Sequence, residues 1–352
     1  MILPTTASTV WILAIVSLLL LGSWANTLKL AGKWRFEYFY FDFVFGILLS
    51  AGVAALVLGS GRPQELTLQD NFLLAGYRKM AWAFGSGVVL NLGTLLLLAA
   101  MTLSGMSVAF GLAMGVALAI GVVWDFANAA QANPTVTFLG VALLLAAVVA
   151  AGLAHVRRLR AEREAAQQAL TPDPRVKTKR ARQAGPALMF VLAVMGGMAL
   201  SMFPRILSEA VGGENSLAPY SAILLLAISA LFSSPFFVLF FTTFPVAGTA
   251  GGPSGYLAGT KLQHLLGVAG GILWGTGMLA GLLAAGAPQN AQPSALIQYA
   301  MSHGALLVAA AWGLLAWREF RQTGNHAGML AAGMVVLFLA GLGLVSFGLS
   351  SK

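Results

Sequence analysis

The sequence has no cysteine and few charged residues. Of its 352 residues, 9% are charged and 59% are hydrophobic. Without cysteine, the chain forms no disulfide and no thiolate-ligated metal or iron–sulfur site, and its four histidines are not spaced as metal ligands. Soluble domains carry about 25% charged residues, so this composition excludes a surface that faces water on all sides. We therefore expect an integral membrane protein that contacts lipid and needs no cofactor.

The net charge of +9 does not indicate a nucleic-acid partner. Nine of the twenty basic residues lie between Arg157 and Arg182, mixed with acidic residues and without aromatic ones. Such a segment is typical of a cytoplasmic loop beside anionic lipid. The first apolar run is not preceded by a basic region and is long enough to span a bilayer, so we expect a retained membrane span rather than a cleaved signal peptide.

Ten segments are long and apolar enough for membrane helices, which need about 20 residues each. Residues 244–261 contain three glycines and a proline between positions 251 and 255, so a re-entrant or broken stretch stays open there. The ten predicted spans are residues 9–28, 37–58, 79–101, 105–125, 135–155, 186–207, 217–243, 262–286, 294–316 and 327–350.

Lysine and arginine are distributed unequally between alternate loops. Fifteen fall on the side of the central loop and five on the other side. Because basic loops stay in the cytoplasm, we predict that the central loop is cytoplasmic and that both termini are outside. The expected location is a cell membrane, of the bacterial inner-membrane kind, crossed many times by the chain.

The basic loop divides the predicted helices into five and five, as residues 1–155, 156–185 and 186–352. An odd number of spans in each half makes any repeat inverted in the membrane. We expect an all-α fold of two inverted five-helix repeats, although glycines also serve ordinary helix packing in lipid. The matching features are Gly87 and Gly93 with Gly271 and Gly277, Trp124-Asp125-Phe126 with Trp317-Arg318-Glu319-Phe320, and Gly140 with Gly333.

Several short patches lie in both halves of the chain. They are Leu21-Gly22-Ser23-Trp24, Tyr40-Phe41-Asp42-Phe43, Gln69-Asp70-Asn71, the Gly87–Gly93 stretch, Gly105-Met106-Ser107-Val108, Trp312-Gly313 and Arg318-Glu319-Phe320-Arg321. In their order and spacing, these patches resemble the ureide permease family. The chain departs from this family in two places. Residues 156–185 contain no phosphate-loop-like motif of the kind that plant members carry, and the asparagine expected in the eighth helix is replaced near Met278.

The resemblance implies a member of the drug/metabolite transporter superfamily with ten helices. Such proteins take up ureides such as allantoin, nucleobases such as uracil, or related heterocycles, driven by protons. Accordingly, we expect a symporter with a small-molecule substrate and a proton, or sodium in its place, as partners. The alternative is a sugar or another exported metabolite or drug as cargo of the same superfamily. We expect no enzyme activity.

Asp42 is the candidate for proton coupling, because it lies inside the second span among aromatic residues. Intramembrane ionisable groups are costly and are functional by default. Burial favours the neutral form of a carboxyl group, and coupling requires a group that loads and releases a proton. The alternative is a structural pairing with Lys29 or Lys33.

Five further residues are candidates for substrate binding. Trp24 and Asn26 together offer an indole face and an amide, which suit a planar amide-rich ligand. Asn91, Trp274 and His303 lie mid-membrane, where a polar group needs a partner or a cavity. An interfacial position for Trp24, interhelix bonding for Asn91 and Trp274, and simple packing for His303 stay open as alternatives.

Ser254 raises a remote alternative. Gly252-Pro253-Ser254-Gly255 fits the Gly-x-Ser-Gly pattern of intramembrane serine proteases. A serine nucleophile needs a histidine base within hydrogen-bond reach, and His303 is the conceivable one. In a chain with 41 glycines such a motif arises readily by chance.

Overall fold

A computed structural model of the chain describes residues 1–60, 66–128, 132–169, 186–321 and 325–351. Within these ranges all regular structure is helical. The helices are α1 (Ala7–Ser23), α2 (Asn26–Leu30), α3 (Phe36–Val57), α4 (Leu68–Ser104), α5 (Met106–Asn128), α6 (Pro134–Ala169), α7 (Pro186–Val211), α8 (Pro219–Thr243), α9 (Pro253–Leu257), α10 (Lys261–Ala285), η1 (Gln289–Ala291), α11 (Ala295–His303), α12 (Ala305–Ala311), the π-helical η2 (Trp312–Ala316) and α13 (Asn325–Ser350).

Nine helices in the described ranges are long and apolar enough to cross a membrane. Each covers one of the predicted spans. The remaining predicted span, residues 294–316, is a pair of helices bent by 41° at Gly304, and it makes ten if the pair counts as one span. Large apolar side chains such as Phe232, Phe236 and Leu239 on α8 face outward, as a lipid contact requires. The chain is accordingly a multi-pass membrane protein.

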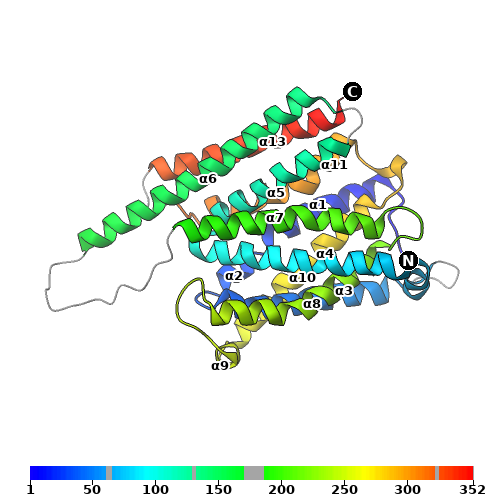
Figure 1. The fold of residues 1–352 in the computed structure, drawn as a ribbon, viewed down its shortest axis with the longest axis horizontal. Helices are drawn as coiled ribbons and strands as arrows, with labels where there is room; N and C mark the ends of the chain where they lie inside the picture. The colour runs from blue at the N-terminus through cyan, green and yellow to red at the C-terminus, as the bar shows by residue number, and fades with distance from the viewer. Residues whose placement is uncertain (61–65, 129–131, 170–185, 322–324, 352) are drawn as a thin grey trace.

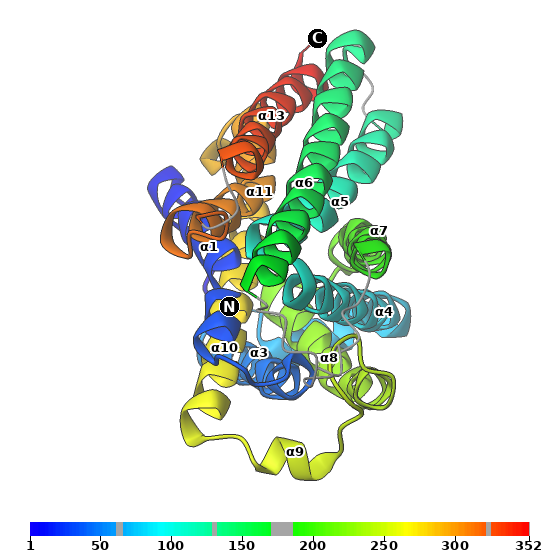
Figure 2. The ribbon, with the colours of Figure 1, turned by 90° about the vertical axis from the view of Figure 1, so that its left-hand side faces the viewer.

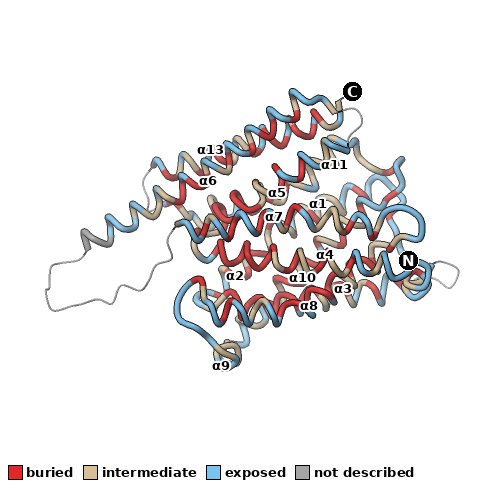
Figure 3. The backbone as a smooth tube through the Cα atoms, viewed as in Figure 1, coloured by how far each residue is buried: buried red, intermediate tan, exposed pale blue. Residues whose placement is uncertain are grey.

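The long helices lie roughly side by side along one direction (Figure 1). The closest partners are α6 with α13, α4 with α7, and α3 with α10, while α8 packs on both α3 and α4. Viewed along the bundle, α6 and α13 form one edge, with α3, α8 and α10 on the opposite side (Figure 2). The buried residues follow the central helices (Figure 3). Very close approach of α3 and α10 depends on Gly46 and Gly271, where an added Cβ at Gly271 would come within 1.9 Å of the Phe43 carbonyl oxygen.

Several helices differ from the predicted limits for local reasons. A capping box between Thr67 and Asp70 starts α4 eleven residues before the predicted position 79, and Gly76, at φ +69°, kinks this added part. In the same way, α6 continues past residue 155 to Ala169, supported by the ion pair of Arg158 with Glu162 one turn later. The first part of the predicted 156–185 linker is therefore helical, and residues 170–185 lie outside the described ranges.

Residues 244–261 form a connection that contains only the short helix α9. Most of its residues are exposed, and in Figure 2 α9 lies beyond the packed helices. The segment thus adds no further span. It positions Tyr256, whose side chain returns to the bundle, as described below.

Candidate functional site

A cavity of about 510 Å³ lies inside the bundle. Side chains from α1, α4, α5, α7, α10 and the α11–α12 pair form its wall, so both halves of the chain contribute to it. The wall is mostly apolar, mainly Leu, Ala, Phe, Met and Gly, with polar groups on ten of its residues. Those polar-bearing residues are Ser17, Trp24, Thr94, Asp125, Ser201, Arg205, Ser208, Trp274, Ser302 and His303. Mostly apolar pockets with few polar groups are typical of small-molecule sites.

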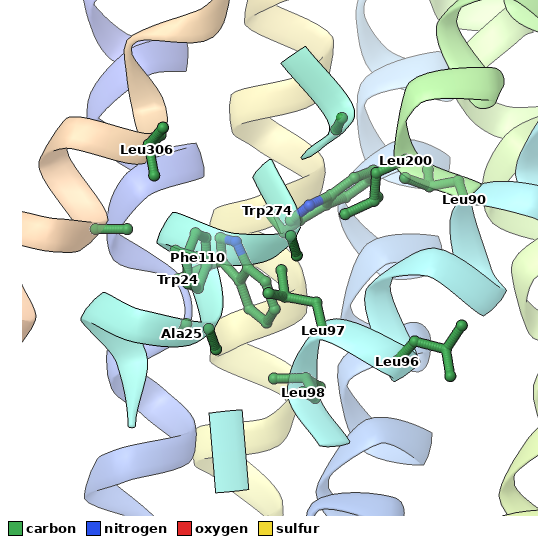
Figure 4. Packing of buried hydrophobic residues seen from close by; sticks show 14 of the residues in the cluster. Trp24, Ala25, Leu90, Leu96, Leu97, Leu98, Phe110, Leu200, Trp274 and Leu306 are labelled. Carbon is green, nitrogen blue, oxygen red and sulfur yellow. The ribbon is translucent and has the colours of Figure 1, made fainter. Parts of the chain in front are cut away.

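Trp24 and Trp274 lie deep in this cavity. Their side chains belong to residues that are only 2% and 6% exposed, and both rings neighbour Phe43, with centroid distances of 4.7 Å and 6.4 Å. Figure 4 shows the two indoles close together among Leu97, Phe110 and other apolar side chains. Neither indole N–H has a hydrogen-bond partner among the described residues. The fully buried donors that lack a partner do not include these two nitrogens, so both are accessible to a group in the open space that they border.

His303 belongs to a second feature of the wall, which we call the Asp125 cluster: Asp125, Arg205, Tyr299 and His303. Arg205 forms an ion pair with Asp125 and donates a 2.7 Å hydrogen bond to the Gly121 carbonyl. Tyr299 donates to Asp125 Oδ2 over 3.3 Å, and its ring stacks on His303 at 4.3 Å. His303 Nδ1 is 2.9 Å from the Tyr299 carbonyl. The cluster joins the last turn of α5 to α7 and α11.

A second ionic junction, the Glu319 cluster, lies at the other end of α5: Glu319, Lys29, Ser107, Asn26 and Trp317. Glu319 forms an ion pair with Lys29 and accepts hydrogen bonds from the backbone N–H groups at positions 106 and 107, at 2.7 Å and 2.9 Å. The Ser107 hydroxyl adds a bond of 2.5 Å. The carboxylate therefore satisfies the unpaired N–H groups at the start of α5.

The charge state of Glu319 follows from these contacts. Burial opposes ionisation, but the attraction of Lys29 and the hydrogen bonds from Lys29 and Ser107 outweigh it and lower the pKa of Glu319. Asn26 supports the junction from the side. Its amide oxygen accepts a 2.6 Å bond from Trp317 Nε1, and its NH2 donates to the Ser23 carbonyl. Asn26 is not among the residues that line the cavity.

Asn91 lies outside the cavity wall as well. Its side-chain oxygen accepts a 2.5 Å bond from the Tyr40 hydroxyl, and its NH2 donates to Ser233 Oγ and to the Ala230 carbonyl. These bonds join α3, α4 and α8. The geometry matches the interhelix alternative of the sequence analysis, because every polar atom of this amide is already bonded within the protein.

Asp42 is buried between α3, α9 and α10, and it is likewise absent from the cavity wall. Its Oδ2 lies 2.7 Å from His264 Nδ1, and its Oδ1 accepts a 2.5 Å bond from the Tyr256 hydroxyl. Burial, followed by the bond to Asp42, raises the pKa of Tyr256. The lysine pairing considered from the sequence does not occur for Lys29, which pairs with Glu319 instead.

Ser254 is exposed near the start of the short helix α9. Among the described residues, no hydrogen bond joins Ser254 to a histidine: His264 contacts Asp42, and His303 contacts Tyr299 and Ser302. α9 and α11 lie far apart in the view of Figure 1. This arrangement lacks the nucleophile–base contact that a serine protease requires.

The structure therefore brings together three of the six residues singled out from the sequence, Trp24, Trp274 and His303, on one cavity. Sequence reasoning missed the Arg205–Asp125 and Lys29–Glu319 pairs. The available signal was the charge of Arg205 in an otherwise apolar segment and the repeated Trp-acid pattern at the ends of two helices. No family model and no curated protein matches this chain.

Proposed function

We propose that the protein is a secondary active transporter that carries a small planar heterocycle, a ureide or a nucleobase, across the membrane by alternating access. The observation that carries the proposal is the cavity between helices of both halves, with the two unpartnered indole N–H groups of Trp24 and Trp274 in its wall. Binding and release of a solute need no covalent chemistry, so the proposal includes no enzyme activity.

The wall chemistry favours a heterocycle over a sugar. An indole N–H only donates hydrogen bonds, so two of them suit the carbonyl oxygens or ring nitrogens of a ureide or nucleobase. Flat apolar walls complement the faces of such a ring. A sugar presents hydroxyl groups in every direction, and the aliphatic wall would leave most of them without a partner.

Equivalent glycine contacts support two inverted repeats. In one such pair, each glycine faces the helix that the repeat predicts: Gly22 meets Ala305 and Val308 on α12, and Gly197 meets Ala113 and Val116 on α5. In another, Gly87 of α4 meets Leu226 and Ser229 on α8, and Gly271 of α10 meets Phe43 and Gly46 on α3. Gly140 and Gly333 differ, because Gly140 contacts α13 whereas Gly333 has no atom within 4 Å. Inverted repeats around a central site are typical of carriers.

Asp42 stays the proposed coupling group, for a proton or for sodium, although it acts at a distance from the cavity. Through His264 it is bonded to the first turn of α10, the helix that carries Trp274. Loss of the Asp42 charge would weaken the contacts to His264 and Tyr256 together. That change would act on α10 as a whole. In this proposal the central loop lies in the cytoplasm, and the direction of transport is uptake.

The experiment is a binding assay on purified protein in detergent. A ligand that prefers the folded state raises the melting temperature, with a stabilisation of about 2.7 kcal/mol at a hundredfold excess over Kd. We expect uracil or allantoin, but not glucose, to do so. Trp274→Phe, which keeps an aromatic ring and removes the donor, should weaken binding about tenfold, as the loss of one hydrogen bond does.

Trp11→Phe is the matched control, since Trp11 lies on the exposed surface of α1 and outside the cavity. Unchanged affinity in Trp274→Phe would remove the indole donor from the site. Stabilisation by glucose alone would replace the heterocycle with a sugar as cargo. For coupling, Asp42→Asn should abolish pH-dependent uptake while binding is retained; an unaltered pH dependence would exclude Asp42.

A further inference from the structure

The Glu319 cluster and the Asp125 cluster are built on the same plan at opposite ends of the bundle. Their attachment points on α5, residues 106–107 and 125, are about 18 residues apart, or about 27 Å at 1.5 Å per residue. Each cluster has an acid near the end of a helical segment, a base near the end of another, and a hydroxyl donor on a third. These are Glu319, Lys29 and Ser107 in one, and Asp125, Arg205 and Tyr299 in the other.

The correspondence follows the order of the chain. Asp125 lies in the last turn of α5 and Glu319 follows η2, each one or two residues after a tryptophan. Arg205 lies near the end of α7 and Lys29 near the end of α2, the continuation of α1. Ser107 is the second residue of α5 and Tyr299 the fifth residue of α11. An exchange of the two halves therefore converts one cluster into the other.

Only one of the two clusters lines the cavity. Asp125, Arg205 and His303 line it, and the exposed residues Ser208, Ala285 and Ser302 bring its wall to the surface beside them. No member of the Glu319 cluster borders the cavity. On that side the wall is formed by Trp24 and Phe110, whose ring centroids are 6.2 Å apart. The structure is thus shut at the Glu319 end and reaches the surface at the Asp125 end.

From this geometry we propose that the two clusters are paired latches of the transport pathway: an end of the cavity is shut while its acid is buried among the three joined segments, as Glu319 is here, and open while its acid is partly exposed, as Asp125 is here. The proposal rests on the proposed carrier function and adds the groups that alternate. Each latch joins three helical segments through one acid, so loss of the acid–base contact releases one segment and loosens the junction of the other two. Alternating access needs such a two-state element at each end.

The test uses the absence of cysteine from the chain. Met114 lines the cavity midway along α5, so Met114→Cys gives a single reporter thiol. A membrane-impermeant maleimide is added to one face or the other of vesicles of known orientation. In this background, Lys29→Met breaks the ion pair but leaves Glu319 on the start of α5, so that the fold is spared. Glu319→Gln is the second variant, and Asp125→Asn breaks the opposite latch.

We expect Lys29→Met to raise labelling from the Lys29 face about fivefold, the population shift that loss of one ion pair of moderate strength produces. Asp125→Asn should raise labelling from the opposite face only. The matched control is Glu162→Gln, which removes an ion pair within α6 that links no two helices, and it should change neither face.

Equal labelling changes on both faces, or no change in Lys29→Met with an unaltered melting temperature, would overturn the latches. The labelling needs no substrate, so the two proposals fail separately. Unchanged labelling in a protein that binds uracil would overturn the latches alone. If the variants change labelling on the expected faces but the protein binds no heterocycle, the latch proposal stands and the proposed substrate class is wrong.

Discussion

The two ends of α5 carry the same kind of acid–base junction in different surroundings. The Glu319 side chain is 3% exposed and accepts bonds from Lys29, two backbone N–H groups and a hydroxyl. The Asp125 side chain is 32% exposed and accepts from Arg205 and, over a longer distance, from Tyr299. Because of its burial and its larger number of donors, the Glu319 junction holds its helices together firmly, whereas the Asp125 junction is a solvent-accessible contact.

The helix itself adds to this difference. Glu319 lies at the start of α5, where a negative charge interacts favourably with the helix dipole and with unpaired N–H groups. Asp125 lies in the last turn, where the dipole disfavours a negative charge. Arg205 compensates, since it pairs with Asp125 and also binds the Gly121 carbonyl. The Asp125 end is accordingly the easier one to open.

The largest expected effect is on stability at the buried junction. Glu319→Ala leaves Lys29 and the start of α5 without a partner, which we expect to lower the free energy of unfolding by about 3–5 kcal/mol. Asp125→Ala should cost about 1 kcal/mol, because solvent screens a pair that is about one-third exposed. Reversible chemical unfolding in detergent measures both. Equal losses in the two variants would contradict the difference between the ends.

A smaller effect compares the two halves at their tightest helix crossings. Gly271→Ala and Gly87→Ala each place a Cβ against the backbone of a neighbouring helix, at 1.9 Å from the Phe43 oxygen and 2.7 Å from the Leu226 oxygen. We expect each to cost about 1–3 kcal/mol, as overpacking does. Gly52→Ala is the control, since nothing lies within 4 Å of an added Cβ there. A large loss of stability in only one of the two variants would contradict the equivalence of the two helix crossings.

How much of the fold follows from the sequence depends on the range of the interaction. Apolar length alone locates the membrane helices, because lipid requires about 20 apolar residues in each. The Thr67–Asp70 capping box, which extends α4, is also a local signal that can be read from the sequence. The 41° bend at Gly304 is different. Glycine permits such a bend without requiring it, so only packing decides it.

The site is harder to predict for the same reason. Depth in the membrane marks Asn91 and Trp274 as groups that need a partner or a cavity, but it does not tell which of the two each one has. Asn91 finds Tyr40 and Ser233 on other helices, whereas Trp274 borders open space. Lys29 and Glu319 are 290 residues apart in sequence. Their pairing depends on how the halves pack, and no local pattern contains that information.

The smallest expected effect concerns the hydroxyl donors that occupy equivalent places in the two clusters. Ser107 donates to Glu319 over 2.5 Å inside the protein, whereas Tyr299 donates over 3.3 Å to Asp125, which lines the cavity. Because hydrogen bonds to charged groups are worth about 1.5–3 kcal/mol when short and aligned, Ser107→Ala should cost about 1.5 kcal/mol. Tyr299→Phe, which keeps the ring stacked on His303, should cost about 0.5 kcal/mol or less, since a long bond contributes little. The measurement is the free energy of unfolding of the two variants side by side. A larger loss in Tyr299→Phe than in Ser107→Ala would make the Asp125 cluster the tighter junction and would exchange the assignment of the closed end.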